Sequence, residues 1–390
     1  MKGLRNLVDK IKPTFEEGGK LSFLYSTFDA FESFLFVPNT VTKKGSHVRD
    51  CVDLKRIMII MVLALVPAML FGVWNTGYQH DLAFGLGWGF WQMIGYGLIK
   101  VIPLYLVSYI VGLAIEFVSA QIRGHEVNEG YLVSGMIIPL IVPVDVPLWM
   151  LAIAVAFAVI IGKEVFGGTG MNIWNPALLA RAFLFFSYPS KMSGENVWTG
   201  GVSRFLDKGN AFMTEGATKL ADAYSGATPL AKVSEGVDAL PSVMDMIVGN
   251  INGCVGETSV IAILIGAALI IFTGVASWKI MVSTVAGGLV VGALAHACGA
   301  SAVPAYYHIL LGGFLFGAVF MATDPVTAAQ TEKGKWIYGF LIGALAVVVR
   351  VWNPGYPEGM MLAILLMNTF APLIDHYVVE GAMKKNAKRA

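Results

Sequence analysis

The sequence has 390 residues, of which 56% are hydrophobic and 14% are charged, and its 27 basic and 26 acidic side chains give a net charge of +1. A soluble domain has about 25% charged residues, and a disordered chain combines low hydrophobicity with high charge. The composition therefore excludes both classes and indicates a polytopic membrane protein. The balanced charge also excludes an extended basic surface for nucleic acid.

The three cysteines, Cys51, Cys254 and Cys298, lie far apart and form no closely spaced pair. Iron–sulfur clusters and structural zinc sites need four ligands, usually with two cysteines close in sequence. We therefore predict no metal site within this chain, and a cluster shared with another subunit is the alternative.

Apolar segments recur from Arg56 onward, after an N-terminal part that lacks the early apolar core of a signal peptide. We predict about ten membrane-spanning helices, each of which needs about 20 residues. They lie at 56–75, 98–119, 131–143, 147–162, 176–188, 258–275, 280–297, 306–321, 336–351 and 359–377. The stretch 83–97 is an eleventh span, an interfacial helix or the start of the second span.

Basic residues indicate the orientation of the spans. They gather before the first span, at 43–56, and after the last, at 384–389. Three short loops have neither Lys nor Arg: 142–146, 298–305 and 352–358. Because Lys and Arg are enriched in cytoplasmic loops, we expect an even number of spans with both termini in the cytoplasm. The long loop 189–257 then lies outside.

Five spans precede the long loop and five follow it, so repeated halves would have opposite orientations. Trp174-Asn175-Pro176 and Trp352-Asn353-Pro354 occupy corresponding positions in the two halves. We therefore predict an all-α polytopic membrane protein built from two inverted five-helix repeats. The expected regions are a cytoplasmic amphipathic segment at 1–55, membrane repeats at 56–188 and 258–378, the outer loop at 189–257 and a basic cytoplasmic tail at 379–390. Segment 1–55 either lies on the bilayer or docks a partner subunit.

The outer loop contains Asp222 and then the run Ser225-Gly226-Ala227-Thr228. Ser and Gly are common turn residues, so a polar turn is one interpretation. The other is a modification site, because a threonine hydroxyl beside Gly and Ala is sterically open to an enzyme. A similar run ends at Thr218 but lacks both the serine and the upstream aspartate, which favours Thr228.

A second candidate region precedes the fifth predicted span. It contains Gly168, Thr169, Asn172 and Asn175, followed by Pro176. Glycines allow a ligand to approach the backbone closely, and Asn amides supply donors and acceptors suited to the edge of a ring such as an isoalloxazine. A turn between helices with Asn caps is the alternative. No GxGxxG fingerprint follows a strand here, which argues against a Rossmann domain.

Several motifs in a fixed order carry a resemblance to a known family. They are Thr42–Arg56, Val165–Gly170, Asn175–Leu178, Arg181–Phe186, Ser225–Thr228, Phe320–Pro325 and Asn353–Met361. Over nearly the whole chain, this set resembles the membrane-protein family that includes the B subunit of bacterial Na+-translocating NADH:quinone oxidoreductases. The same family includes the D subunit of the related ferredoxin:NAD+ oxidoreductases. The segment Ser46–Asp50 favours the quinone reductase.

The resemblance implies that Thr228 holds FMN covalently through a phosphoester, within the motif formed by Asp222, Ser225, Gly226 and Ala227. It also implies a second, non-covalent flavin, riboflavin. We place the riboflavin near Gly168, Thr169, Asn172 and Asn175.

The resemblance also implies that this chain is one subunit of a six-subunit complex in the bacterial inner membrane. The chain would then not be active alone. An outward-facing FMN-bearing subunit would deliver electrons, and an FAD and iron–sulfur subunit would oxidise NADH. Electrons would cross this chain to quinone, and their passage would be coupled to Na+ transport.

Charged residues inside the membrane are costly and are candidates for function. Glu116 and Asp375 lie near the predicted inner ends of the second and last spans, where each is a candidate for Na+ sensing or for protonation of quinone. The alternative is that each reaches the headgroup region. For Asp324 and Arg181 we expect pairing or capping. The family often has Gly-Gly where this chain has Gly112-Leu113, which leaves contacts with quinone open.

Two other functions fit parts of the pattern. The chain would be the D subunit of a ferredoxin-linked complex if its neighbouring genes encoded a polyferredoxin. Two inverted halves also suit a small-solute channel without redox activity. The channel interpretation predicts no covalent flavin on Thr228.

Overall fold

The computed structural model describes residues 2–15, 19, 25, 28, 32, 36, 42, 44–46, 54–123, 130–192, 194, 198–200, 226–353 and 357–388. Regular secondary structure within these ranges is entirely helical, without a strand. Six helices are long and apolar enough to cross a membrane. The predicted class, an all-α polytopic membrane protein, is confirmed.

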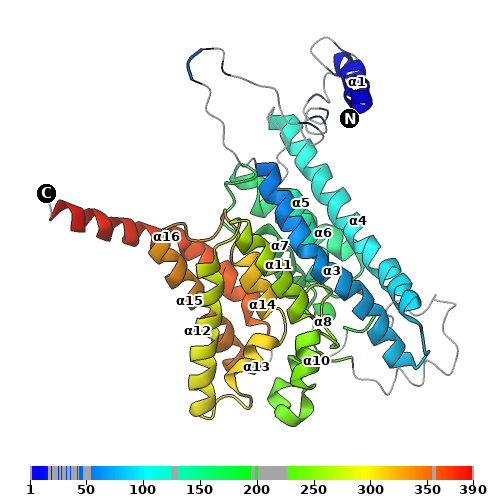
Figure 1. The fold of residues 1–390 in the computed structure, drawn as a ribbon, viewed down its shortest axis with the longest axis vertical. Coiled ribbons are helices and arrows are strands. Elements are labelled where there is room, and N and C mark those ends of the chain that lie inside the picture. Colours follow the sequence, from blue (N-terminus) through cyan, green and yellow to red (C-terminus); the bar gives the residue numbers. More distant parts are fainter. Residues whose placement is uncertain are drawn as a thin grey trace.

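The long helices are α3 (Leu54–Phe84), α4 (Phe90–Arg123), α6 (Leu148–Gly162, extended by the 3-10 turn η3, Glu164–Phe166), α12 (Trp278–Ala297), α15 (Glu332–Trp352) and α16 (Gly359–Ala387). Three shorter apolar helices stand beside them: α5 (Tyr131–Leu140), α7 (Pro176–Ser187) and α11 (Val260–Phe272). Figure 1 shows α3 and α4 side by side and the C-terminal part of α16 leaving the bundle sideways. Each of these nine helices overlaps one predicted span.

The eighth predicted span, 306–321, is broken rather than continuous. It consists of α13 (Ala305–Leu310), α14 (Phe314–Phe316) and the π-helical turn η6 (Gly317–Met321). Gly312, with a φ of 61°, lies at the break between α13 and α14. Irregular backbone at membrane depth is tolerated where protein surrounds it, and Phe314, Phe316 and Phe320 are fully buried here.

The ambiguous stretch 83–97 is resolved in favour of the start of the second span. Helix α3 continues to Phe84, and the chain then turns through Gly85 and Gly87, whose φ angles are 62° and 66°. Helix α4 begins directly afterwards, at Phe90. The stretch therefore forms the turn and the first part of α4, without an additional span.

The two sets of five segments share part of their pairing, but α3 packs closely against α4 whereas α11 and α12 have no comparable contact. Helix α6 packs against α4 and α7 in the first set, and α15 packs against α12 and α16 in the second. Helices α3 and α11 meet in antiparallel order, because Gly72 lies against Val255 while Gly266 lies against Ala64. The antiparallel order of α3 and α11 agrees with inverted repeats, while the repeat boundaries stay a prediction.

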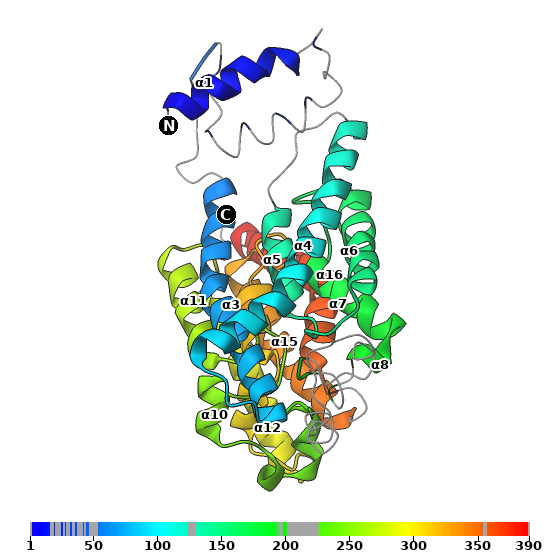
Figure 2. The ribbon, with the colours of Figure 1, turned by 90° about the vertical axis from the view of Figure 1, so that its right-hand side faces the viewer.

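Short elements cover the two ends of the bundle. They are α1 (Lys2–Ile11), η1 (Lys12–Thr14), α8 (Pro189–Met192), η4 (Ala231–Glu235), η5 (Val237–Ala239) and α10 (Val243–Val248). Figure 1 shows α1 at the end where α3 begins, and α10 and α13 at the opposite end, and Figure 2 shows α1 and α10 at the same two ends. Most of the predicted segment 1–55 lies outside the described residues, so its function stays a prediction.

Candidate functional site

Three cavities form a row from one end of the bundle to the other, and α7 (Pro176–Ser187) lines two of them. The Thr228 cavity lies at one end, the Asn175 cavity at the other, and the Arg181 cavity between them. On α7 itself, Pro176 lines the Asn175 cavity, while Leu178 and Arg181 line the middle one. Because α7 has 12 residues, its axis is about 18 Å long.

The Thr228 cavity has a volume of about 320 Å³ and is lined by the segment that carries Thr228 and by the loop before α11. The Thr228 amide donates to the Gly194 carbonyl at 2.9 Å, and the Thr228 hydroxyl accepts from the Ala231 amide at 3.3 Å. Thr258 also lines this cavity, and its buried hydroxyl has no hydrogen-bond partner. Because buried polar groups are normally satisfied, the cavity fits a ligand with polar atoms.

The predicted motif before Thr228 is described only in part. Gly226 is buried against Thr199, since a Cβ at Gly226 would lie 3.3 Å from the Thr199 hydroxyl oxygen. Ala227 is half-buried. Asp222 and Ser225 lie outside the described residues, so their part in the site stays a prediction.

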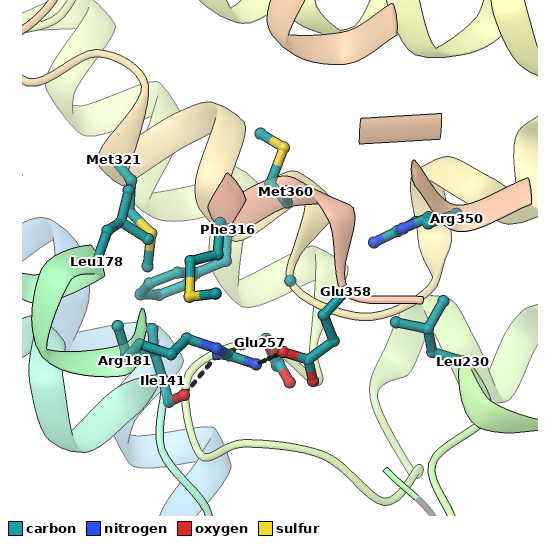
Figure 3. A pocket seen from close by; sticks show the side chains of 12 residues that line it. Ile141, Leu178, Arg181, Leu230, Glu257, Phe316, Met321, Arg350, Glu358 and Met360 are labelled. Atoms are coloured by element: carbon teal, nitrogen blue, oxygen red, sulfur yellow. Dashed lines mark hydrogen bonds and ion pairs between the residues drawn. The ribbon is translucent and has the colours of Figure 1, made fainter. Parts of the chain in front are cut away.

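Buried charges surround the Arg181 cavity, which has a volume of about 370 Å³. Arg181 Nη1 donates to the Ile141 carbonyl at 2.5 Å and lies 3.8 Å from the Glu257 carboxylate, while Nη2 pairs with Glu358. Figure 3 shows the Arg181 guanidinium meeting Glu358 at the floor of the cavity. Burial raises the pKa of Glu257, and the nearby guanidinium opposes that rise. The pairing expected for Arg181 is confirmed.

Asn175 begins α7 and connects it to the second half. Its Oδ1 accepts from the amides of Ala177 and Leu178, at 3.0 and 3.4 Å, which caps the helix. Its Nδ2 donates to the Asp324 carboxylate at 3.2 Å, and Asp324 also accepts from Thr327 at 3.1 Å. The side-chain amide of Asn175 is thus engaged with protein atoms, which is the capping alternative and the pairing expected for Asp324.

The other predicted riboflavin residues lie in the loop before α7. Thr169 and Asn172 line the Asn175 cavity, whose volume is about 610 Å³, whereas Gly168 does not. Asn172 Nδ2 donates to the Trp174 carbonyl at 3.1 Å. Gly167 and Gly168 have φ angles of 120° and 97°, which side chains other than glycine rarely adopt. The glycines therefore shape a loop that places Thr169 and Asn172 on the cavity wall.

Lys163, at the end of α6, brings a cation to the same cavity. Its ammonium group pairs with Glu116 of α4, and both side chains are buried. The second carboxylate oxygen of Glu116 has no hydrogen-bond partner. Glu116 therefore does not line the Asn175 cavity itself, but it contacts Lys163, which does.

Asp375, the other predicted charged site, supports the start of α15. Its carboxylate accepts from the amides of Gln330 and Thr331, at 2.7 and 3.0 Å, and from the Thr331 hydroxyl at 2.5 Å. Asp375 lines none of the three cavities. The structure therefore brings Thr169, Asn172 and Asn175 together and leaves Asp375 apart from them.

Known proteins resemble this chain over almost its whole length. The family described as NQR2, RnfD, RnfE matches residues 41–384. The chain belongs to this family. The B subunit of the Na(+)-translocating NADH-quinone reductase of Ectopseudomonas mendocina is 44% identical over 99% of both chains. The proteins of the same name from Pseudomonas aeruginosa and Chromohalobacter salexigens are 43% identical, over 99% of this chain and 99% and 97% of theirs.

For this member of the NQR2, RnfD, RnfE family, the structure adds charged residues that the sequence analysis did not select. Glu257 and Glu358 each directly precede a predicted span, and Arg350 lies inside one. All three line the Arg181 cavity. The cost of placing charge in a membrane was the available signal, and it applies to Arg350 as it does to Glu116.

Proposed function

We propose that this chain is the membrane subunit of a Na+-translocating NADH:quinone reductase that carries two flavins and passes electrons between them. FMN would be attached to Thr228 by a phosphoester, and riboflavin would lie in the Asn175 cavity. The row of three cavities, two of them lined by α7, is the observation that carries this proposal. The names of the full-length relatives support the same activity.

The residues at the two ends suit the two flavins. At the Thr228 cavity, the residue that would form the ester shares the cavity wall with Thr258, whose buried hydroxyl has no hydrogen-bond partner. At the Asn175 cavity, Thr169, Asn172 and Lys163 offer polar groups, while Met58 and Met61 offer apolar contact. A flavin supplies one- and two-electron chemistry, and the protein supplies position and electrostatic tuning.

The decisive test is the covalent flavin. We expect the purified full-length chain to fluoresce as a flavin band on a denaturing gel, and mass spectrometry of the 189–257 region to find an FMN adduct. Thr228→Ala should abolish both signals, and Thr218→Ala, which changes the similar run, should leave them unchanged. Fluorescence that persists in Thr228→Ala would contradict the assignment.

We also propose that the Thr228 end faces the outside of the bacterial inner membrane, with both termini in the cytoplasm. Cys298 directly follows the last residue of α12, at the same end of the bundle as Thr228. Cys298 is exposed, whereas Cys254 is buried. A membrane-impermeant maleimide should therefore label Cys298 in intact spheroplasts, and Cys298→Ala should remove that label. Labelling that depends on Cys298 and appears only in inverted vesicles would reverse the orientation.

The remaining assignments follow from the proposed complex. An FMN-bearing subunit would reduce the flavin on Thr228, and a separate FAD and iron–sulfur subunit would oxidise NADH. Quinone would accept the electrons, and Glu116 and Asp375 are the proposed residues for Na+ or for the quinone proton. Purification of the chain with these partners would test the assembly.

The D subunit of a ferredoxin-linked complex is the second candidate, because the matching family description includes RnfD. Both candidates carry the same motif at Thr228, so the flavin test does not separate them. Neighbouring genes do: a flavin–NADH reductase subunit indicates the quinone reductase, and a polyferredoxin indicates the ferredoxin-linked complex.

A further inference from the structure

Arg350 is a buried cation without a close anionic partner. Its Nη1 donates to the His308 carbonyl, its guanidinium carbon lies 5.6 Å from the centre of the Phe314 ring, and its Nε has no hydrogen-bond partner. Within the described part of the chain, no carboxylate is within ion-pair distance of Arg350. Glu257 and Glu358, which line the same cavity, are both within ion-pair distance of Arg181.

The Arg350 guanidinium lies close to the Thr228 cavity. Leu230, Glu257 and Glu358 line both that cavity and the Arg181 cavity, so the two adjoin. Gly312 lines the Thr228 cavity, and a Cβ at this position would lie only 3.4 Å from Arg350 Nη2. Figure 3 shows the guanidinium pointing inward, above Glu358 and opposite Arg181. A group on Thr228 that reached past this shared wall would come close to Arg350.

A buried guanidinium is stable when an anion compensates its charge and accepts its free N–H groups. The oxidised flavin ring is neutral, and uptake of two electrons and one proton leaves it with one negative charge on its N1–C2 side. Charge near N1 is one of the ways in which a protein tunes a flavin. This ring state offers a negative charge and acceptor atoms to Arg350, whose Nε has no hydrogen-bond partner and which has no carboxylate within ion-pair distance in the described part of the chain.

We propose that Arg350 faces the ring of the flavin attached to Thr228, stabilises its reduced form and so raises its reduction potential. The inference rests on the proposed covalent flavin. It adds a residue from the second repeat, more than a hundred positions after Thr228, to that site. It also assigns opposite effects to two neighbours, because Arg350 favours the negative ring and Glu358 opposes it.

The test is a potentiometric titration of the covalent flavin in the full-length chain, with dithionite as reductant and mediator dyes in detergent. Dialysis against potassium bromide first removes any flavin that is not covalently held. Arg350→Gln should lower the midpoint potential by about 30 mV, which is a tenfold change in the redox equilibrium of a two-electron couple. Arg350→Lys keeps the charge and should stay near the unaltered value. Glu358→Gln removes a negative charge and should raise the potential.

These variants separate an electrostatic role from a structural one. A residue that only supports the fold would change flavin content or thermal stability without moving the potential in opposite directions. If Arg350→Gln does not accumulate as folded protein, Arg350→Met, which also removes the charge, takes its place in the titration. An unchanged potential in a flavin-bearing variant that lacks the Arg350 charge would overturn the role of Arg350 alone. A chain without flavin on Thr228 would overturn both proposals.

Discussion

The side-chain amide of Asn175 donates a hydrogen bond of 3.2 Å to the carboxylate of Asp324, which ties the first turn of α7 to the chain that precedes α15. The same side chain caps α7 through its other atom. One residue therefore sets the start of the helix that lines two of the three cavities and fixes it to the second half of the molecule. The wall of the Asn175 cavity depends on this connection, since both residues line it.

We expect Asn175→Ala to lower the free energy of unfolding by about 1–2 kcal/mol through the loss of the cap, and further through the loss of the Asp324 bond. Asn175→Ser retains a capping oxygen but has no amide to donate, so its stability should lie between that of the unaltered chain and that of Asn175→Ala. Unfolding in mixed micelles with increasing dodecyl sulfate measures the stabilities of the three chains. Equal stability of the alanine variant and the unaltered chain would contradict the account.

The buried pair of Glu116 and Lys163 gives a second prediction. Removing one partner leaves an uncompensated buried charge, which costs about 3–5 kcal/mol. Glu116→Gln and Lys163→Met should each destabilise strongly, whereas the double variant should lose much less than the sum. A double-mutant cycle of unfolding free energies measures the coupling. Additive effects would show that the two charges do not compensate each other.

The sequence predicted the helices well but not their ends. The first span was expected at 56–75, yet α3 continues to Phe84 through a polar stretch. Tertiary contacts satisfy that stretch: the Asn75 amide donates to the Ile251 carbonyl at 2.9 Å, and His80 Nδ1 lies 2.7 Å from the Gly200 carbonyl. An apolar run marks only the lipid-facing part of a helix, and partners distant in sequence decide where the helix stops.

The candidate site also has a part that the sequence predicts and a part that it does not. The residues around Thr228 and Asn175 form short local motifs, which sequence analysis can find. The cluster of Arg181, Glu257 and Glu358 comes from three separate regions of the chain, and it assembles only when the two halves pack. No local spacing reports such a cluster, because each member alone resembles an ordinary charge at a helix end.

Close packing of α12 and α15 gives a third prediction. A Cβ at Gly343 would lie 1.9 Å from the Thr284 carbonyl oxygen and 2.8 Å from the Gly288 amide nitrogen. Gly343→Ala must therefore push the two backbones apart, and overpacking of this kind costs about 1–3 kcal/mol. We expect a lower unfolding temperature in detergent, measured by intrinsic fluorescence.

The matched control is Gly381 in the exposed part of α16, where a Cβ would meet nothing within 4 Å. Gly381→Ala should be neutral or stabilise the helix by up to about 1 kcal/mol. If Gly343→Ala behaved like this control, the close approach of α12 and α15 would be wrong.

The last prediction concerns the non-covalent flavin proposed for the Asn175 cavity. Asn172 lines that cavity and its side chain is anchored to the Trp174 carbonyl, so its amide is held at the wall. Asn172→Ala should weaken riboflavin retention by about tenfold, the effect of losing one hydrogen bond worth about 1.4 kcal/mol. Acid precipitation releases non-covalent flavin for fluorescence measurement, and flavin that stays on the chain is the internal reference. Asn386→Ala, on the exposed C-terminal turn of α16, should release as much flavin as the unaltered chain. If the Asn172→Ala variant released as much flavin as the unaltered chain, the assignment of riboflavin to this cavity would be contradicted. The assignment of the covalent flavin to Thr228 would not be affected.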